Sequence, residues 1–355
     1  MNRIQNTAFL EQGKKTIRLN EVTLMRSVLA LLIVFMHAFT CYNHSWGEPK
    51  GFVDVPLYKW LSRISFSFTL EAFVFISGYL FAFQRYTLNR KEGIAILIQQ
   101  KIKRLIIPSI VFSTVYFFFF YQYKGFSEML YSIINGCGHM WFLPMLFWCF
   151  IGGWLLEQIN VSNIWKMVFL ICLHLLAIFS LPMQLNRACF FMIYFYLGFV
   201  VYKKSEKIKS YHSIKRLLQW GWIFYILVFA VFRPLSDVFV CSEKESVFHQ
   251  LTILVCHNAC QLIYAGLGLA VFYFSAIYYV KRNQLKPFTN KLAANSFGIY
   301  LFQQFVLLFL YYKTSFSLIV GPYWLPWCGF AIAIFVSYIL SDFLRHTKIG
   351  KFLIG

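Results

Sequence analysis

The stretch MRSVLALLIVFMHAF, residues 25–39, decides the fold, because it is apolar enough to span a lipid bilayer. It nevertheless holds two ionisable residues, Arg26 near its start and His37 near its end. Ionisable side chains inside a membrane are costly and usually mark a functional site or pathway. The fold follows from the apolar run, and the function is to be sought at the two exceptions.

The composition of the whole chain agrees with a membrane location. Of its 355 residues, 59% are hydrophobic, 21% are aromatic and only 13% are charged, whereas a soluble domain carries roughly 25% charged residues. No alternation of polar and apolar residues suggests a barrel, so helices are the remaining way to span the bilayer. We therefore predict an all-α polytopic membrane protein.

The membrane spans can be placed by apolar runs of about 20 residues, the length that crosses the hydrocarbon core. The sequence predicts ten, of which the sixth is short and the seventh contains Arg233 before Pro234. Their centres lie near Ala30, Phe73, Phe112, Phe147, Leu170, Tyr194, Leu227, Ala265, Leu301 and Ile332.

The basic residues predict the orientation, because cytoplasmic loops collect Lys and Arg. With the N-terminus inside, the inner segments hold about 25 of the 33 Lys and Arg. These segments are 1–26, 84–104, 158–166, 203–216, 281–292 and 343–355. We expect one transmembrane domain over 1–355 with cytoplasmic tails 1–20 and 343–355. The net charge of +20 then reflects topology and attraction to anionic lipids, not a nucleic-acid partner.

The nine cysteines show neither CxxC nor His/Cys metal spacing, so no metal site is expected. Most fall inside spans and are interpreted as small buried hydrophobes; a meeting of Cys137 with Cys241 in the outer loops remains an alternative. No cleavage site follows the first apolar run, which indicates an uncleaved first span.

Arg26 and His37 are eleven residues apart, which places them within ~20° of one helix face and roughly 16 Å apart along the axis. Arginine binds phosphate well, and histidine exchanges a proton near neutral pH. This stripe suits a long phosphorylated donor that enters from the cytoplasm, and coenzyme A thioesters have that shape. The alternatives are a charge anchor for Arg26 and a packed histidine for His37.

The second span carries Glu71 at about the depth of His37, since the two helices run in opposite directions. We expect Glu71 to accept a hydrogen bond from the His37 ring and make it a better base. A neutral glutamic acid bonded to backbone is the alternative. Further along, Ser77 and Gly78 mark a position where two helices approach closely.

Basic residues begin the third span in QQKIKRLIIP, residues 99–108. Lys101 and Arg104 are placed to bind the phosphates of a donor together with Arg26. Anchoring to lipid headgroups is the alternative.

On the outer side, His139 and Trp141 in GHMWFL begin the fourth span, and Arg187 is an arginine that departs from the charge rule. We interpret these three residues as contacts to an anionic acceptor substrate. His257, Asn258 and Gln261 form a polar patch in the eighth span, which favours helix–helix hydrogen bonds.

Taken together, these stretches resemble the acyltransferase family 3 membrane proteins over nearly the whole chain. RSVLALLIVFMH resembles the Arg-X10-His signature of that family, and LEAFVFISGYL, KIKRLIIP and GHMWFL resemble further motifs. Two departures stand out: Lys101 replaces the first arginine of an Arg-x-x-Arg motif, and Gln303 stands where many members have histidine. The soluble hydrolase-like domain of some members is absent.

The resemblance implies transfer of an acyl group, usually acetyl, from cytoplasmic acyl-CoA to a sugar hydroxyl of a surface or lipid-linked glycan, in a bacterial inner membrane. Arg26, Lys101 and Arg104 would hold the CoA phosphates. His37, with Glu71, would deprotonate the acceptor or be acylated first, and both routes stay open. The rival interpretations are a transporter or flippase without covalent chemistry, and a sensing module that kept only the fold.

Overall fold

The computed structural model describes residues 19–123, 125–177, 181–205, 214–241 and 247–354, and in these ranges it is built from helices without strands. Most of the predicted N-terminal tail 1–20 and of the basic segment 203–216 lies outside the described residues. The all-α prediction is confirmed.

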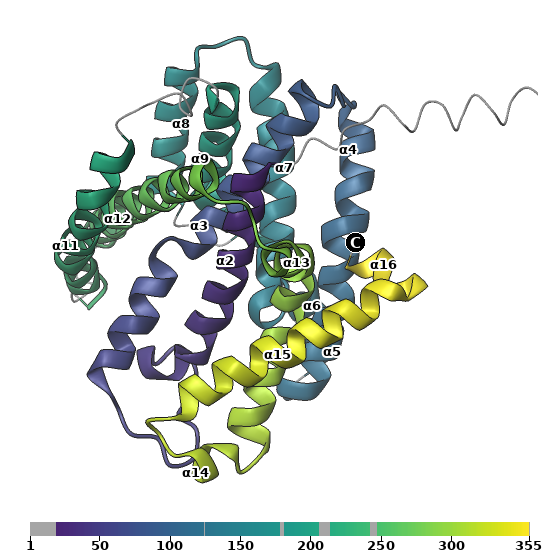
Figure 1. The fold of residues 1–355 in the computed structure, drawn as a ribbon, viewed down its shortest axis with the longest axis vertical. Coiled ribbons are helices and arrows are strands. Elements are labelled where there is room, and N and C mark those ends of the chain that lie inside the picture. The colour runs from purple at the N-terminus through teal and green to yellow at the C-terminus, as the bar shows by residue number, and fades with distance from the viewer. Residues whose placement is uncertain (1–18, 124, 178–180, 206–213, 242–246, 355) are drawn as a thin grey trace, which may run out of the picture.

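All ten predicted span centres fall inside helices (Figure 1). Among the described residues, nine helical segments are long and apolar enough to cross a membrane. The helices are α2 (Asn20–Ala38), α3 (Pro56–Tyr86), α4 (Ile94–Lys101), α5 (Ile107–Phe120), α6 (Phe126–Asn135), α7 (Phe142–Gln158), α8 (Asn163–Leu175), α9 (Leu185–Lys203), α11 (Ile214–Cys241), α12 (Val247–Arg282), α13 (Pro287–Leu308), α14 (Phe316–Val320), α15 (Leu325–His346) and α16 (Lys348–Leu353). Short 3₁₀ turns lie at Thr40–Asn43, Gly138–Trp141 and Pro182–Gln184, and π turns at Ile102–Ile106 and Phe309–Lys313.

The short span is the fifth rather than the sixth, because α8 has only 13 residues whereas α9 has 19. The chain around α8 nevertheless returns across the bundle. The Tyr86 hydroxyl donates to Glu157 at 2.9 Å, and Lys203 donates to the Tyr86 hydroxyl at 3.3 Å. The last residues of α3, α7 and α9 therefore meet at one end of the bundle. Since α7 and α9 finish at the same end, the chain between them crosses back, which gives ten crossings.

We call the end where α3, α7 and α9 finish the basic end, and the opposite end, where α3 begins, the far end. Tyr58 near the start of α3 donates to the backbone of Tyr323 at 2.9 Å, so α15 also begins at the far end. α14 lies there too, at the bottom of Figure 1.

α3 and α9 pack at very short range through two glycines. A Cβ on Gly78 would lie 1.9 Å from the carbonyl oxygen of Phe195, and a Cβ on Gly198 would lie 2.0 Å from that of Phe75. Neither position has room for a side chain. The predicted close approach of two helices at Gly78 is confirmed, and small residues are the usual means of such packing in membranes.

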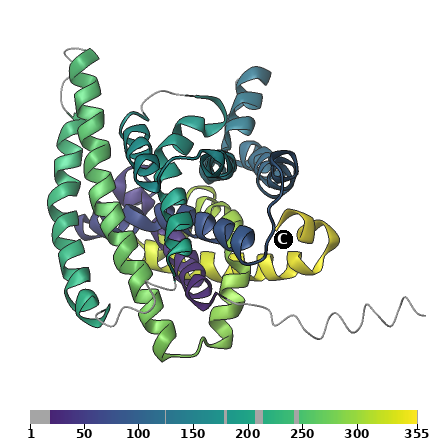
Figure 2. The same cartoon turned by 90° about the horizontal axis from the view of Figure 1, so that it is seen from above.

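α2 lies in the middle of the bundle and packs against α3, α12, α13 and α15. α11 and α12 run side by side along one edge (Figure 2). α11 is the most peripheral span, since only 17% of its apolar window is buried inside the protein. The central position of α2 brings its polar side chains into contact with the neighbours that form the site.

Candidate active site

Arg26 and His37 both face α13. The Arg26 guanidinium donates to the Ser296 hydroxyl at 3.0 Å, and Nδ1 of His37 lies 3.0 Å from the side-chain amide of Gln303. Seven residues, or about two helical turns, separate Ser296 from Gln303 on α13. The predicted shared face of Arg26 and His37 is confirmed, because both residues contact the same stripe of one neighbouring helix.

A cavity of about 240 Å³ begins at Arg26. It lies between α2, α3, α7, α13 and the helix formed by α4, the π turn and α5. Arg26, Lys101 and Arg104 line it together with the polar residues Ser77, Gln84 and Ser296. The remaining wall is apolar and is made by Ile33, Leu70, Phe73, Ile76, Leu80, Phe81, Leu105, Phe142, Leu143, Leu146, Phe150, Phe297 and Tyr300.

The three cations of this cavity have no acidic counterpart. No Asp or Glu lines it, and no ion pair recorded for the described residues involves Arg26, Lys101 or Arg104. The ammonium group of Lys101 instead lies 3.5 Å from the centroid of the Phe150 ring. Unpaired cations in an apolar environment are costly. Their convergence on one cavity therefore favours an anionic ligand that enters from outside.

A π turn places two of these cations. α4 continues through the π turn into α5, where Pro108 is the second residue. Proline lacks an N–H, and its ring clashes with the carbonyl four residues earlier, here that of Arg104. Widening into a π turn relieves the clash, and such turns are frequent at functional sites. Lys101 and Arg104 line the cavity, whereas Lys103 is exposed and does not.

A second, smaller pocket of about 100 Å³ adjoins the first at the basic end. Both pockets share Gln84, Lys101 and Arg104, so these residues lie between them. The other polar residues of the second pocket are Arg85, Arg90, Glu92 and Gln100. The two cations thus stand where a polar vestibule opens into an apolar cavity.

His37 lies one helical turn beyond the end of the cavity that Ile33 lines. Its ring stacks on Trp46 with a centroid distance of 5.9 Å and meets the edges of Phe66 and His139 at 6.1 Å each. His37 is only 8% exposed. This aromatic surrounding holds the ring in one orientation.

The hydrogen bonds of His37 define its protonation. Nδ1 lies 2.9 Å from the carbonyl oxygen of Ile33, which only accepts, so Nδ1 carries the hydrogen. A ring N–H cannot accept from an amide N–H, and Oε1 of Gln303 is buried without a partner among the described residues. We therefore assign the Gln303 amide with Oε1 toward Nδ1. Nε2 of His37 keeps a free lone pair and can act as the base.

The predicted hydrogen bond between Glu71 and His37 is not formed. Glu71 is 1% exposed and is hydrogen-bonded to Gln261 of α12. The depth of Glu71 in the membrane suggested the contact, but the rotation of α3 prevents it. Leu70 and Phe73 line the cavity, and Glu71 is turned about 100° from the first and about 160° from the second. Gln303 occupies the place beside Nδ1 that was expected of Glu71.

His139 is not at the membrane interface, where the sequence suggested it, but is buried beside His37 with 4% exposure. Its Nε2 donates to the carbonyl of Leu301 at 3.1 Å, and its own carbonyl accepts from the Tyr300 hydroxyl at 2.6 Å. The 3₁₀ turn at Gly138–Trp141 directs it inward against α13. His139 therefore supports the surroundings of His37.

Trp141 and Arg187 do lie together. The guanidinium carbon of Arg187 is 4.1 Å from the centroid of the Trp141 ring, and Arg187 is exposed. None of the ion pairs recorded for the described residues includes Arg187. An aromatic face next to an available cation is a surface that suits a sugar bearing a negative charge.

Sequence reasoning missed that the polar residues of α13 belong to the site. Ser296, Tyr300 and Gln303 recur at spacings of four and three, which places them on one helix face. Ser296 holds Arg26, Tyr300 lines the cavity and Gln303 contacts His37. A polar stripe at helical spacing in an otherwise apolar span was the signal that could have found them.

Comparison with known proteins agrees with this geometry. No curated protein and no solved structure matches the chain. The family model for acyltransferase family 3, described as an acyltransferase domain, matches residues 19–346. This range holds α2 to α15, with Arg26, His37, the cavity and the polar stripe of α13. The match spans nearly the whole sequence, and the chain therefore belongs to acyltransferase family 3.

Proposed function

We propose that this multi-pass membrane acyltransferase moves an acyl group, most simply acetyl, from cytoplasmic acyl-CoA to a hydroxyl of a cell-surface or lipid-linked glycan. We further propose that it works in a bacterial inner membrane with its basic end in the cytoplasm. The observation that carries the proposal is the set of three cations without acidic partners in one cavity that ends next to His37.

The donor fits the two pockets in order. The polar vestibule with Arg90 and Gln100 suits the nucleotide, and Arg26, Lys101 and Arg104 suit its phosphates. The mostly apolar cavity suits the pantetheine arm, which is long, thin and nearly uncharged. The thioester then arrives near Ile33 and Tyr300, one turn from His37. Lysine at position 101 supplies charge without the fork geometry of arginine.

His37 supplies the proton chemistry. In direct transfer, Nε2 takes the proton of the acceptor hydroxyl, whose oxygen attacks the thioester carbonyl carbon. The carbon–sulfur bond breaks, and the CoA thiolate leaves and is protonated to the thiol. Alternatively Nε2 attacks first, the thiolate leaves, and the acyl-imidazole passes its acyl group to the hydroxyl. In both routes Nδ1–H stays bonded to Ile33 and Gln303, which stabilises positive charge on the ring.

The acceptor side is proposed at the Trp141–Arg187 pair. An exposed aromatic ring offers a stacking face for a sugar, and the guanidinium above it offers a contact for an anionic group of the glycan.

Transfer of radiolabelled acetyl from acetyl-CoA by the purified protein tests the function. We expect label on protein, added glycan or free acetate with the wild type, and its loss in His37→Ala folded to the same extent. Binding of acetyl-CoA is measured beside it. A wild type that neither binds acetyl-CoA nor transfers label would exclude the acyltransferase assignment and leave a transporter. Binding that persists without transfer to any acceptor tried would indicate a sensing module.

A further inference from the structure

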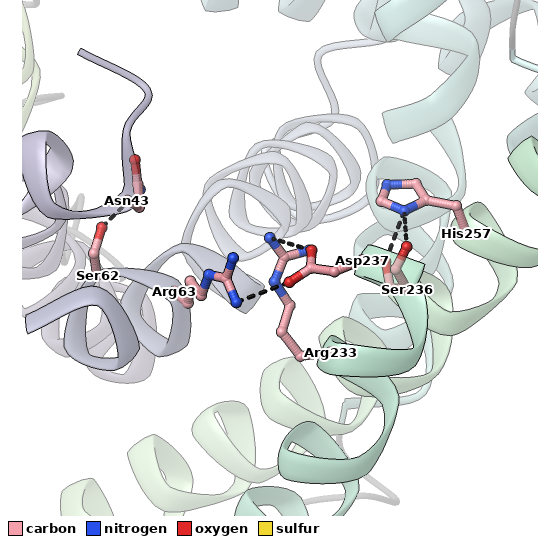
Figure 3. A network of polar contacts seen from close by, with 7 residues as sticks. All are labelled: Asn43, Ser62, Arg63, Arg233, Ser236, Asp237 and His257. Atoms are coloured by element: carbon pink, nitrogen blue, oxygen red, sulfur yellow. Dashed lines mark hydrogen bonds and ion pairs between the residues drawn. The ribbon is translucent and has the colours of Figure 1, made fainter. Parts of the chain in front are cut away.

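A second charged cluster lies away from the cavity, at the far end between α3 and α11 (Figure 3). Arg63 contacts one carboxylate oxygen of Asp237 at 2.8 Å, and Arg233 contacts the other at 3.3 Å. One carboxylate thus serves two guanidinium groups, and the cluster carries one surplus positive charge. The side chains of Arg63 and Arg233 are 20% and 23% exposed. Both remain accessible from outside.

The surroundings of the cluster are those of the lipid–water boundary. On α11, Val231, Leu235 and Val238 beside it are exposed apolar side chains. On α3, the exposed Trp60 has its ring centroid 6.0 Å from the guanidinium carbon of Arg63. Tryptophan is enriched at the level of the lipid headgroups. The two arginines therefore lie where the phosphates of one leaflet lie.

The neighbouring groups do not neutralise the surplus charge. Ser236 and His257, at 2.7 Å, form a hydrogen bond with each other. Arg233 is hydrogen-bonded to the Tyr264 hydroxyl, a neutral group. Glu71 is bonded to Gln261, and no ion pair recorded for the described residues joins it to either arginine. Fastening α11 to α3 needs only one arginine for Asp237, so the second requires another explanation.

We propose that Arg63 and Arg233 bind the phosphate of a lipid in the leaflet at the far end. A guanidinium presents paired donors that match phosphate oxygens, and each of the two uses only part of its donors on Asp237. The lipid chain then runs along the exposed apolar side chains of α11. The site does not depend on the proposed function. Two sources share this chemistry, a bulk phospholipid and a polyprenyl phosphate that carries a saccharide.

The second source would connect the site to the reaction. Phe66 follows Arg63 by one helical turn and contacts the His37 ring. A lipid-linked saccharide held by its phosphate at Arg63 would therefore present its sugar on the side of α3 nearest His37.

Native mass spectrometry of the delipidated full-length protein in an uncharged detergent tests the site. The probes are phosphatidylglycerol, undecaprenyl phosphate and diacylglycerol, which lacks phosphate. We expect both phosphate lipids to bind and diacylglycerol not to. Arg63→Gln and Arg233→Gln each leave one arginine paired with Asp237 and should weaken binding of the phosphate lipids roughly tenfold. Lys313→Gln, on α13, is the control and should bind as the wild type does.

Asp237→Asn separates a binding site from a structural contact. It removes the anion that competes with phosphate, so phosphate lipids should bind several-fold more tightly. Unchanged binding in both arginine variants, equal binding of diacylglycerol, or no gain in Asp237→Asn would each overturn the proposal. Tighter binding of undecaprenyl phosphate than of phosphatidylglycerol assigns the site to the lipid-linked carrier, and equal binding assigns it to bulk phospholipid.

Discussion

The base of the proposed reaction depends on a neutral residue. Nδ1–H of His37 is held by the Ile33 carbonyl and by Gln303, so the ring presents Nε2 with a free lone pair. A carboxylate beside Nδ1 would stabilise the imidazolium by charge, whereas Gln303 stabilises it by a dipole. The site thereby avoids an ionised acid inside the membrane, which would be costly before the substrate binds.

Gln303→Leu removes this hydrogen bond and should lower kcat without raising the KM for acetyl-CoA. A hydrogen bond to a group that becomes charged is worth about 1.5–3 kcal/mol, which corresponds to a roughly 10- to 100-fold loss in rate. Steady-state kinetics of label transfer give both parameters. Gln303→Glu, which again accepts from Nδ1–H, should recover activity. Equal kcat in Gln303→Leu and wild type would remove Gln303 from the mechanism.

Arg104→Gln should raise the KM for acetyl-CoA about tenfold and leave kcat nearly unchanged, because one charge-assisted contact to phosphate is lost. Lys103→Gln is the matched control. It removes the same charge from the same π turn, but the exposed Lys103 does not line the cavity. A rise in KM that is equal in both variants would point to general attraction of the donor and contradict a specific phosphate site at Arg104.

At the scale of the elements, the contact of α3 with α9 is the most constrained in the bundle. Gly78→Ala places a Cβ against the backbone of Phe195, so the helices must separate. We expect a loss of stability of about 1–3 kcal/mol, the usual cost of overpacking. A thermal unfolding curve in detergent measures it. Gly266→Ala on α12 is the control, because its Cβ meets nothing within 4 Å; it should not destabilise. A Gly78→Ala protein as stable as wild type would refute this packing.

Helix positions followed from the sequence because apolar runs are a property of local composition, and every predicted centre lies in a helix. The spacing of Arg26 and His37 also sufficed to place them on one face, since helical phase within a span is fixed. The partner of His37 could not be predicted in the same way. It depends on how each neighbouring helix is rotated about its own axis, and that rotation is set by packing. Glu71 has the matching depth and the wrong rotation, whereas Gln303 has both.

At the scale of the whole molecule, the two ends of the bundle carry different chemistry. The basic end opens through the polar vestibule to three unpaired cations, and the far end holds the surplus charge of Arg63 and Arg233. The buried ring of His37 lies between them. Such an arrangement suits two substrates that approach from opposite sides of the membrane and react at one histidine, because neither has to cross the bilayer before the transfer.

This arrangement requires an even number of crossings, so that both chain termini lie on the side of the basic end. The number depends on α8, whose 13 residues rise only about 20 Å. If the chain around α8 crosses, as the meeting of α7 and α9 at the basic end indicates, fluorescent-protein fusions at either terminus should fluoresce in the cytoplasm. Alkaline phosphatase inserted after Gly321, at the far end, should be active outside. An active phosphatase fused to one terminus alone would show nine crossings and reverse the bundle on one side of α8. The cations of the cavity and the ends of α7 and α9 could then no longer face the same compartment, and a cytoplasmic acyl-CoA could not reach His37 by the path proposed.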